Sequence, residues 1–298
     1  MNWFAPRKVI IQGITEYQAA FCATQMRAYG TDIIAGVSPG KGDSEVSGIP
    51  VFNLVEEVQS ANPEQDIDIS LIFVNAYQVL DAAKEAIAAG IRQIIIFTPR
   101  VPPLDTINLI KCARATNTLI LGPGSHGIIV PQQTCIGNLL PQFYQPGSVG
   151  LITSSRHLCY EVAAELNAAE RGQSIVVSLG SDRIIGSGFS YWLSVLNEDA
   201  QTKAIVAIGQ RINEIEEIAA YSKYRGYDKP VIAYLAGLKA PQEKLYRDAR
   251  TIISNHLSAS IPAVNRDRQI STRLETLGIK LATKPSEIPL LLQRTCSK

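Results

Sequence analysis

The sequence runs Ile69-Ser70-Leu71-Ile72-Phe73-Val74, continues with a helical pattern from Tyr77 to Ala89, and then reads Gln93-Ile94-Ile95-Ile96-Phe97. Continuous apolar strands separated by an amphipathic helix are typical of a parallel sheet that is covered on both faces. A strand–helix–strand unit of this kind closes with a right-handed crossover. The stretch therefore predicts an α/β fold built on a doubly wound parallel sheet.

Similar apolar runs recur on both sides of this unit and divide the chain into two series. The first series is Lys8 to Ile11, Thr31 to Ala35, the two runs quoted above, and Thr118 to Leu121; the second is Val149 to Ile152, Ser174 to Ser178, Ala204 to Ile208 and Pro230 to Tyr234. Proline and glutamine are frequent in residues 131–147. We predict a first domain at 1–130, a linker at 131–147 and a second domain at 148–298.

Composition restricts the class of protein. The chain has 298 residues, 46% of them hydrophobic and 18% charged, with a formal net charge of +1. This balance gives no electrostatic reason to bind nucleic acid. Five scattered cysteines without metal-ligand spacing favour reduced thiols over disulfides or a metal site. We find neither a signal-peptide pattern nor a long apolar span, and so expect a cytoplasmic protein without membrane association.

The turn after the first strand is a candidate phosphate site. Residues 12–19 read Gln-Gly-Ile-Thr-Glu-Tyr-Gln-Ala and open a helix, where backbone amides and the helix dipole favour an anion. The dinucleotide fingerprint needs three spaced glycines, and only Gly13 is present. The turn therefore indicates phosphate binding but not ordinary NAD binding.

Two further motifs carry a family resemblance. Residues 36–42 read Gly-Val-Ser-Pro-Gly-Lys-Gly, and residues 229–241 read Lys-Pro-Val-Ile-Ala-Tyr-Leu-Ala-Gly-Leu-Lys-Ala-Pro. With the motifs between them, they resemble the succinyl-CoA synthetase (succinate–CoA ligase) α-subunit family over nearly the whole chain, from Lys8 to about Pro289. The resemblance implies a Rossmann-like CoA-binding domain followed by a flavodoxin-like ligase domain.

The resemblance also implies a set of CoA-contacting positions. In the family the first turn reads Gly-Phe-Thr-Gly-Ser-Gln-Gly, whereas Glu16 and Tyr17 stand here for its second glycine and its serine. An acid and a bulky ring beside the CoA phosphates imply weak CoA binding, with no cofactor required. The implied positions are Gly13, Thr15, Glu16, Tyr17, Gln18, Lys41, Phe97, Thr98 and Pro99.

The resemblance implies changes in the catalytic machinery as well. Asp248 stands where the family carries its phosphorylated histidine, Gln210 where it carries the glutamate that orients that histidine, and Arg156 at a glycine of the phosphate-receiving helix start. A carboxylate lacks the neutral nucleophilic nitrogen of imidazole. We therefore expect no catalytic residues at the family positions, and a divergent member that is a pseudoenzyme.

Two function classes remain open. One is a non-catalytic scaffold, regulator or weak CoA sensor, and the other is an active acyl-CoA ligase α subunit with a separate ATP-grasp β subunit. His126 and His157 could each act as a replacement nucleophile. The partner is expected to be a β-like subunit or a second copy of the chain. It would bind near Tyr160, Glu161 and the turn Gly180-Ser181-Asp182.

Overall fold

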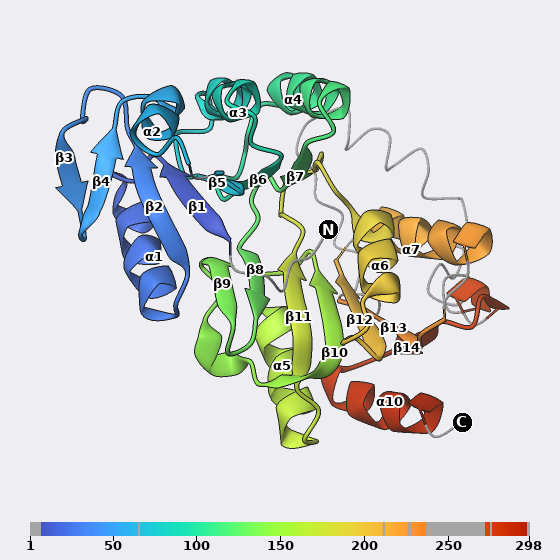
Figure 1. Cartoon of the computed structure of the whole chain (residues 1–298). Helices are drawn as coiled ribbons and strands as arrows, with labels where there is room; N and C mark the ends of the chain where they lie inside the picture. Colours follow the sequence, from blue (N-terminus) through green and yellow to red (C-terminus); the bar gives the residue numbers. More distant parts are fainter. Residues whose placement is uncertain are drawn as a thin grey trace, which may run out of the picture.

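The computed structural model describes residues 7–64, 66–210, 212–225, 228–236, 272–274 and 276–296. These residues form two seven-stranded sheets with helices packed on them (Figure 1). Most neighbouring strands are parallel. The α/β architecture expected from the apolar runs is confirmed.

The first sheet has the strand order β3-β4-β2-β1-β5-β6-β7. All of its neighbouring strands are parallel except the β3–β4 pair. Its strands are β1 (Lys8–Gln12), β2 (Asp32–Val37), β3 (Ser44–Val46), β4 (Ile49–Phe52), β5 (Ile69–Ile72), β6 (Gln93–Ile96) and β7 (Leu119–Leu121); its helices are α1 (Tyr17–Ala28), α2 (Val55–Ala61), α3 (Val79–Ala88) and α4 (Pro103–Ala115). The strand order reverses between β1 and β5, and ligands of open α/β sheets bind beyond the carboxyl ends of strands at such a reversal.

The second sheet has the order β14-β13-β12-β10-β11-β8-β9. Strands β8 and β9 run antiparallel to their neighbours. Its strands are β8 (Gly127–Val130), β9 (Thr134–Gly137), β10 (Pro146–Thr153), β11 (Gln173–Ser178), β12 (Ala204–Gly209), β13 (Val231–Leu235) and β14 (Lys280–Ala282); the helices are α5 (Leu158–Ala168), α6 (Phe189–Glu198), α7 (Ile212–Arg225) and α10 (Ile288–Cys296), with short 3-10 turns at Pro141–Phe143 and Pro285–Glu287.

The segment predicted to be a linker is part of the second sheet. Residues 131–147 contain β9 and the start of β10, and β8 precedes them in the same sheet. The proline and glutamine content of this segment predicts an exposed connection, but Cys135, Ile136 and Leu139 within it are buried. Burial of these apolar residues outweighs the loop-like composition, so the first sheet ends at β7 and the second begins at β8.

The two halves share one hydrophobic core. A single apolar cluster extends from Met26 on α1 and Leu71 on β5 to Phe189 and Trp192 on α6. Separate clusters lie under α2, α3 and α4 and under α5 and α10. The side chain of Thr31, next to β2, also donates a 2.7 Å hydrogen bond to the carbonyl of Cys135 on β9. This shared packing holds the loops of the first sheet against the second.

Candidate functional site

The residues expected to contact CoA lie together beyond the carboxyl ends of the strands of the first sheet. Gly13 follows β1, Lys41 follows β2 and Phe97 follows β6. These three strands are parallel, so their carboxyl ends lie at the same edge. Thr15 and Ser38, from neighbouring loops, lie 2.8 Å apart between their hydroxyl oxygens. The structure thus brings together residues that are far apart in the sequence.

The turn at Gly13 has the geometry of a phosphate cradle. Gly13 has a φ of +82°, and a Cβ there would lie 2.9 Å from the amide nitrogen of Val74. Its own amide donates a 2.7 Å hydrogen bond to the carbonyl of Val37. Helix α1 begins at Tyr17 without a side-chain cap, so its first amides can receive an anion. Gly13 itself packs against the loop after β5, so the part of this phosphate cradle that is open to an anion is the uncapped start of α1.

Asn53 organises the loop that presents Lys41, and sequence reasoning missed it. Its Oδ1 atom accepts hydrogen bonds from the amides of Gly40 (2.9 Å) and Gly42 (3.0 Å). Lys41 itself is exposed. An asparagine directly after an apolar strand is a turn signal, and it was the one available clue to this contact.

The segment after β6 packs closely against the loop after β5. The rings of Phe73 and Phe97 stack with centroids 4.5 Å apart. The Thr98 hydroxyl donates to the carbonyl of Val74 at 2.7 Å, and the Thr98 carbonyl accepts from the amide of Gly124 at 3.1 Å. Pro99 is exposed and has no amide hydrogen to offer a ligand. Phe97 and Thr98 are therefore held by contacts within the protein, and Pro99 is the exposed residue of this segment.

We expect the double variant Glu16→Gly/Tyr17→Ser to bind CoA about fivefold more tightly than the natural chain, because it removes a like charge and a large ring from the phosphate cradle. Glu16 precedes α1 and is exposed, and Tyr17 is 85% exposed. Calorimetric titration with CoA measures the change. Asp81→Asn, at an exposed acid in the first turn of α3, is the control and should leave the affinity unchanged. Unaltered binding by the double variant would mean that this turn does not contact CoA.

The residues predicted at the former catalytic centre lie around the start of α5. The side-chain nitrogen Nε2 of Gln210 donates a 2.8 Å hydrogen bond to the Ser155 hydroxyl. Arg156, the residue after Ser155, is exposed. The Tyr160 ring packs on that of Phe143, with centroids 4.8 Å apart. Asp248 lies outside the described residues. The structure therefore brings Arg156, Gln210 and Tyr160 to one region, at the start of α5.

A buried carboxylate that sequence reasoning missed lies one turn from Gln210. Glu214 is 5% exposed, and its Oε2 atom accepts from the backbone amide of Gln210 (2.8 Å) and from the Ser154 hydroxyl (2.9 Å). Acidic residues are common in the first turn of a helix, because the positive end of the helix dipole stabilises them. The sequence position of Glu214 therefore does not distinguish it as a site residue. A negative group is thus present near position 210 even though residue 210 is neutral.

The candidate histidines occupy different environments. His126 is half-buried, and its Nδ1 atom lies 3.2 Å from Oδ1 of Asn138. Burial, reinforced by the positive charge of Arg156, lowers the pKa of His126 to about 4. His157 is exposed immediately before α5. His126 is therefore neutral at pH 7, and nothing among the described residues places either ring beside a carboxylate that could activate it.

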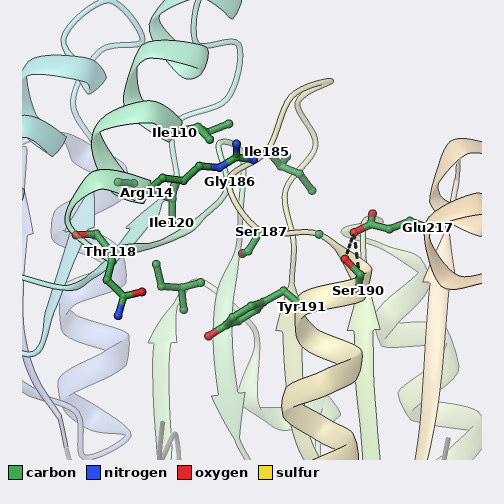
Figure 2. Close-up of a pocket in the computed structure, with 14 residues that line it drawn as sticks. Ile110, Arg114, Thr118, Ile120, Ile185, Gly186, Ser187, Ser190, Tyr191 and Glu217 are labelled. Atoms are coloured by element: carbon green, nitrogen blue, oxygen red, sulfur yellow. Dashed lines mark hydrogen bonds between the residues drawn. The ribbon is translucent and has the colours of Figure 1, made fainter. Parts of the chain in front are cut away.

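A separate hollow of about 510 Å³ lies between the α4–β7 region and the start of α6 (Figure 2). Arg114 stands on one side and Glu217 on the other. One oxygen of Glu217 accepts hydrogen bonds from the Ser190 amide (3.0 Å) and hydroxyl (2.8 Å). A carboxylate therefore already occupies the start of α6, and none of the predicted site residues lines this hollow.

The described part of the chain has neither a metal-binding cluster nor a membrane-spanning helix. Among the described residues there is no group of three or more histidine, cysteine, aspartate or glutamate side chains arranged to hold a metal ion. No described helix has both the length and the apolar character needed to span a membrane.

Comparison with known proteins agrees with this geometry. The family described as CoA binding domain matches residues 4–100, and the family described as succinyl-CoA ligase like flavodoxin domain matches residues 146–256. The succinate–CoA ligase (ADP-forming) subunit alpha 2 of Archaeoglobus fulgidus is 38% identical over 285 residues, which is 96% of both chains. The chain belongs to the succinate–CoA ligase α-subunit family. The corresponding α subunit of Staphylococcus aureus is 36% identical to this family member over 94% of its length and 90% of the relative.

Solved structures share the fold of this α-subunit family member. ATP citrate lyase from Methanothrix soehngenii, in complex with citrate and coenzyme A, has a TM-score of 0.77 at 17% identity over 98% of this chain. The dinucleotide-forming acetyl-coenzyme A synthetase 1 of Ca. Korarchaeum cryptofilum has a TM-score of 0.69 at 18% identity over 94%. This chain spans 50% and 59% of those two longer chains. The resemblance inferred from the motifs is confirmed, as is the order of the two domains.

Proposed function

We propose that this chain is the CoA-binding α-type subunit of an acid–CoA ligase and works with a separate β subunit. The observation that carries the proposal is the phosphate cradle at Gly13, built in a chain whose relatives over 96% of its length are succinate–CoA ligase α subunits. The amides at the start of α1 would hold a CoA phosphate, and Lys41 would approach it from the neighbouring loop. CoA, when bound, supplies the thiol that accepts the acyl group.

A catalytically silent α-type subunit is the second candidate, and it is favoured by one set of sequence positions. Asp248, Gln210 and Arg156 stand where the family resemblance implies the phosphorylated histidine, its orienting glutamate and a glycine. In this case the chain would keep CoA binding and partner association as a scaffold or regulator. The buried Glu214 argues in the other direction, because it keeps a negative group near position 210.

Reconstitution separates the two candidates. The purified chain is mixed with the β subunit of an α/β ligase relative, ATP, Mg²⁺, CoA and a carboxylic acid, and acyl-CoA is measured by chromatography. An active subunit would give acyl-CoA, and only when both subunits are present. CoA binding and β association without acyl-CoA would select the silent subunit. Absence of both CoA binding and association would refute both candidates.

We expect no phosphohistidine on this chain when it is incubated with labelled ATP, Mg²⁺ and the β subunit, because Asp248 provides no imidazole nitrogen. The measurement is acid-labile, base-stable label on the isolated chain. The triple variant Asp248→His/Gln210→Glu/Arg156→Gly restores the implied family residues and should gain such a label, whereas Asp248→His alone should not. Base-stable label on the natural chain would instead place the phosphate on one of its three histidines, and separate substitution of His126, His157 and His256 would identify the carrier.

A further inference from the structure

A hollow of about 550 Å³ lies between α1 and the start of α5, where the two halves of the chain meet. Its volume falls within the roughly 300–1,000 Å³ that is usual for small-molecule sites. The side chains that decide its chemistry are Phe21, Leu139, Leu140, Phe143, Arg156 and Tyr160. Arg156 and Tyr160, described above at the start of α5, therefore form part of its wall.

The walls of this α1–α5 pocket are largely apolar and aromatic. Phe21 on α1 is 56% exposed and Phe143 is 37% exposed, so part of each ring surface is free to contact a molecule in the pocket. Phe143 packs against Tyr160 to form an aromatic wall. Burial raises the pKa of the Cys22 thiol to about 11, so that thiol stays protonated and adds to the apolar surface. The pocket therefore favours an apolar group of ring or branched-chain size.

One positive charge stands at the edge of this apolar surface. Arg156 is the only acidic or basic residue with a permanent charge in the lining. No described acidic residue lies within ion-pairing distance of its guanidinium. Its charge reaches across the pocket, since it opposes the rise in pKa that burial causes in Cys22 on α1 and in Tyr160 on α5. An occupant with one negative charge would complement it.

We infer that the α1–α5 pocket binds a monocarboxylic acid with an aromatic or branched apolar tail. The carboxylate pairs with Arg156, and the tail lies against Phe21, Phe143 and Tyr160. A dicarboxylate such as succinate would place its second charge against these apolar walls, and a buried charge without a partner is strongly unfavourable. The inference rests on the proposed function in that it names the acyl substrate of that ligase.

The test is calorimetric titration of the full chain with three probes: phenylacetate, 2-phenylethanol and succinate. Phenylacetate should bind about tenfold or more tightly than either of the others, because only it offers both a single carboxylate and an apolar ring. Arg156→Gln should weaken phenylacetate binding by about tenfold and leave 2-phenylethanol binding unchanged. Phe143→Ala should weaken both ring-containing probes. Arg114→Gln, at the exposed arginine of the other hollow, is the matched control and should change nothing.

The outcomes separate this inference from the proposed function, because binding is read without turnover. Equal or tighter binding of succinate, no effect of Arg156→Gln, or no binding of phenylacetate would each overturn the inference. If CoA and the β subunit bind while phenylacetate does not, only the substrate assignment falls. If phenylacetate binds as expected while CoA does not, the pocket stands and the ligase proposal falls.

Discussion

Replacing Asp182 by alanine is expected to lower the free energy of unfolding by about 1–3 kcal/mol, because the exposed amide of Arg100 and the part-buried amide of Val101 both lose a charged acceptor. The two carboxylate oxygens of Asp182 accept hydrogen bonds from the amides of Arg100 (2.8 Å) and Val101 (3.0 Å). Arg100 has a φ of +61°, a conformation that a non-glycine residue holds only with support. The Asp182 contact joins the loop after β11 to the loop after β6.

The same variant should also weaken CoA binding, because Thr98 and Pro99 directly precede the supported residues. Guanidinium unfolding gives the stability change, and calorimetry gives the CoA affinity, which we expect to fall several-fold. Asp182→Asn keeps one acceptor oxygen, so its stability and its CoA affinity should lie between those of the natural chain and of Asp182→Ala. Asp32→Ala, at an exposed acid that begins β2, is the control. A stability loss below about 1 kcal/mol would show that the contact is a weak surface interaction.

Asp182 also illustrates what the sequence could and could not predict. The apolar runs predicted every strand at the centre of the two sheets, since continuous burial imposes a local pattern. Asp182, which belongs to the turn expected to meet a partner, also accepts a hydrogen bond from an amide 82 residues away, and no sequence pattern predicts that contact. Long-range hydrogen bonds leave no periodic trace in the chain. The sequence analysis did not predict the four-residue strands β8 and β9, because both are short and glycine or proline residues lie at their ends.

In the candidate site, too, local features can be recognised from the sequence, whereas contacts between distant residues cannot. The turn at Gly13 and the loop at Lys41 can be recognised as a candidate site from the sequence, because a strand–turn–helix start is a local signal. The supporting contacts of Asn53 and Glu214 were not, because each depends on a partner brought close by the fold. The α1–α5 pocket could not be predicted either, since its walls come from three separate segments. Sequence reasoning therefore placed the backbone of the site better than its side-chain environment.

Lowering the pH from 7 to about 4.5 is expected to destabilise the chain by about 2–3 kcal/mol through His126 alone. Burial and the nearby positive charge of Arg156 lower the pKa of His126 from 6.5 to about 4 in the folded chain. Above pH 6.5 the ring is neutral in both states and costs nothing. As the pH falls from 6.5 towards 4, the unfolded chain binds a proton that the folded chain does not, so stability is lost across that window.

Variants at and near His126 test whether this residue causes the loss of stability at low pH. His126→Phe keeps a ring against Phe97, whose centroid lies 5.5 Å from that of the imidazole, but cannot take up a proton. Urea unfolding at a series of pH values should show that this variant loses less stability than the natural chain between pH 6.5 and 4.5. Arg156→Gln should give an intermediate loss, because it removes the second largest cause of the lowered pKa. Arg114→Gln should behave as the natural chain does. Identical pH profiles for the natural chain and His126→Phe would show that protonation of His126 does not oppose folding, and that its ring is solvated in the folded chain.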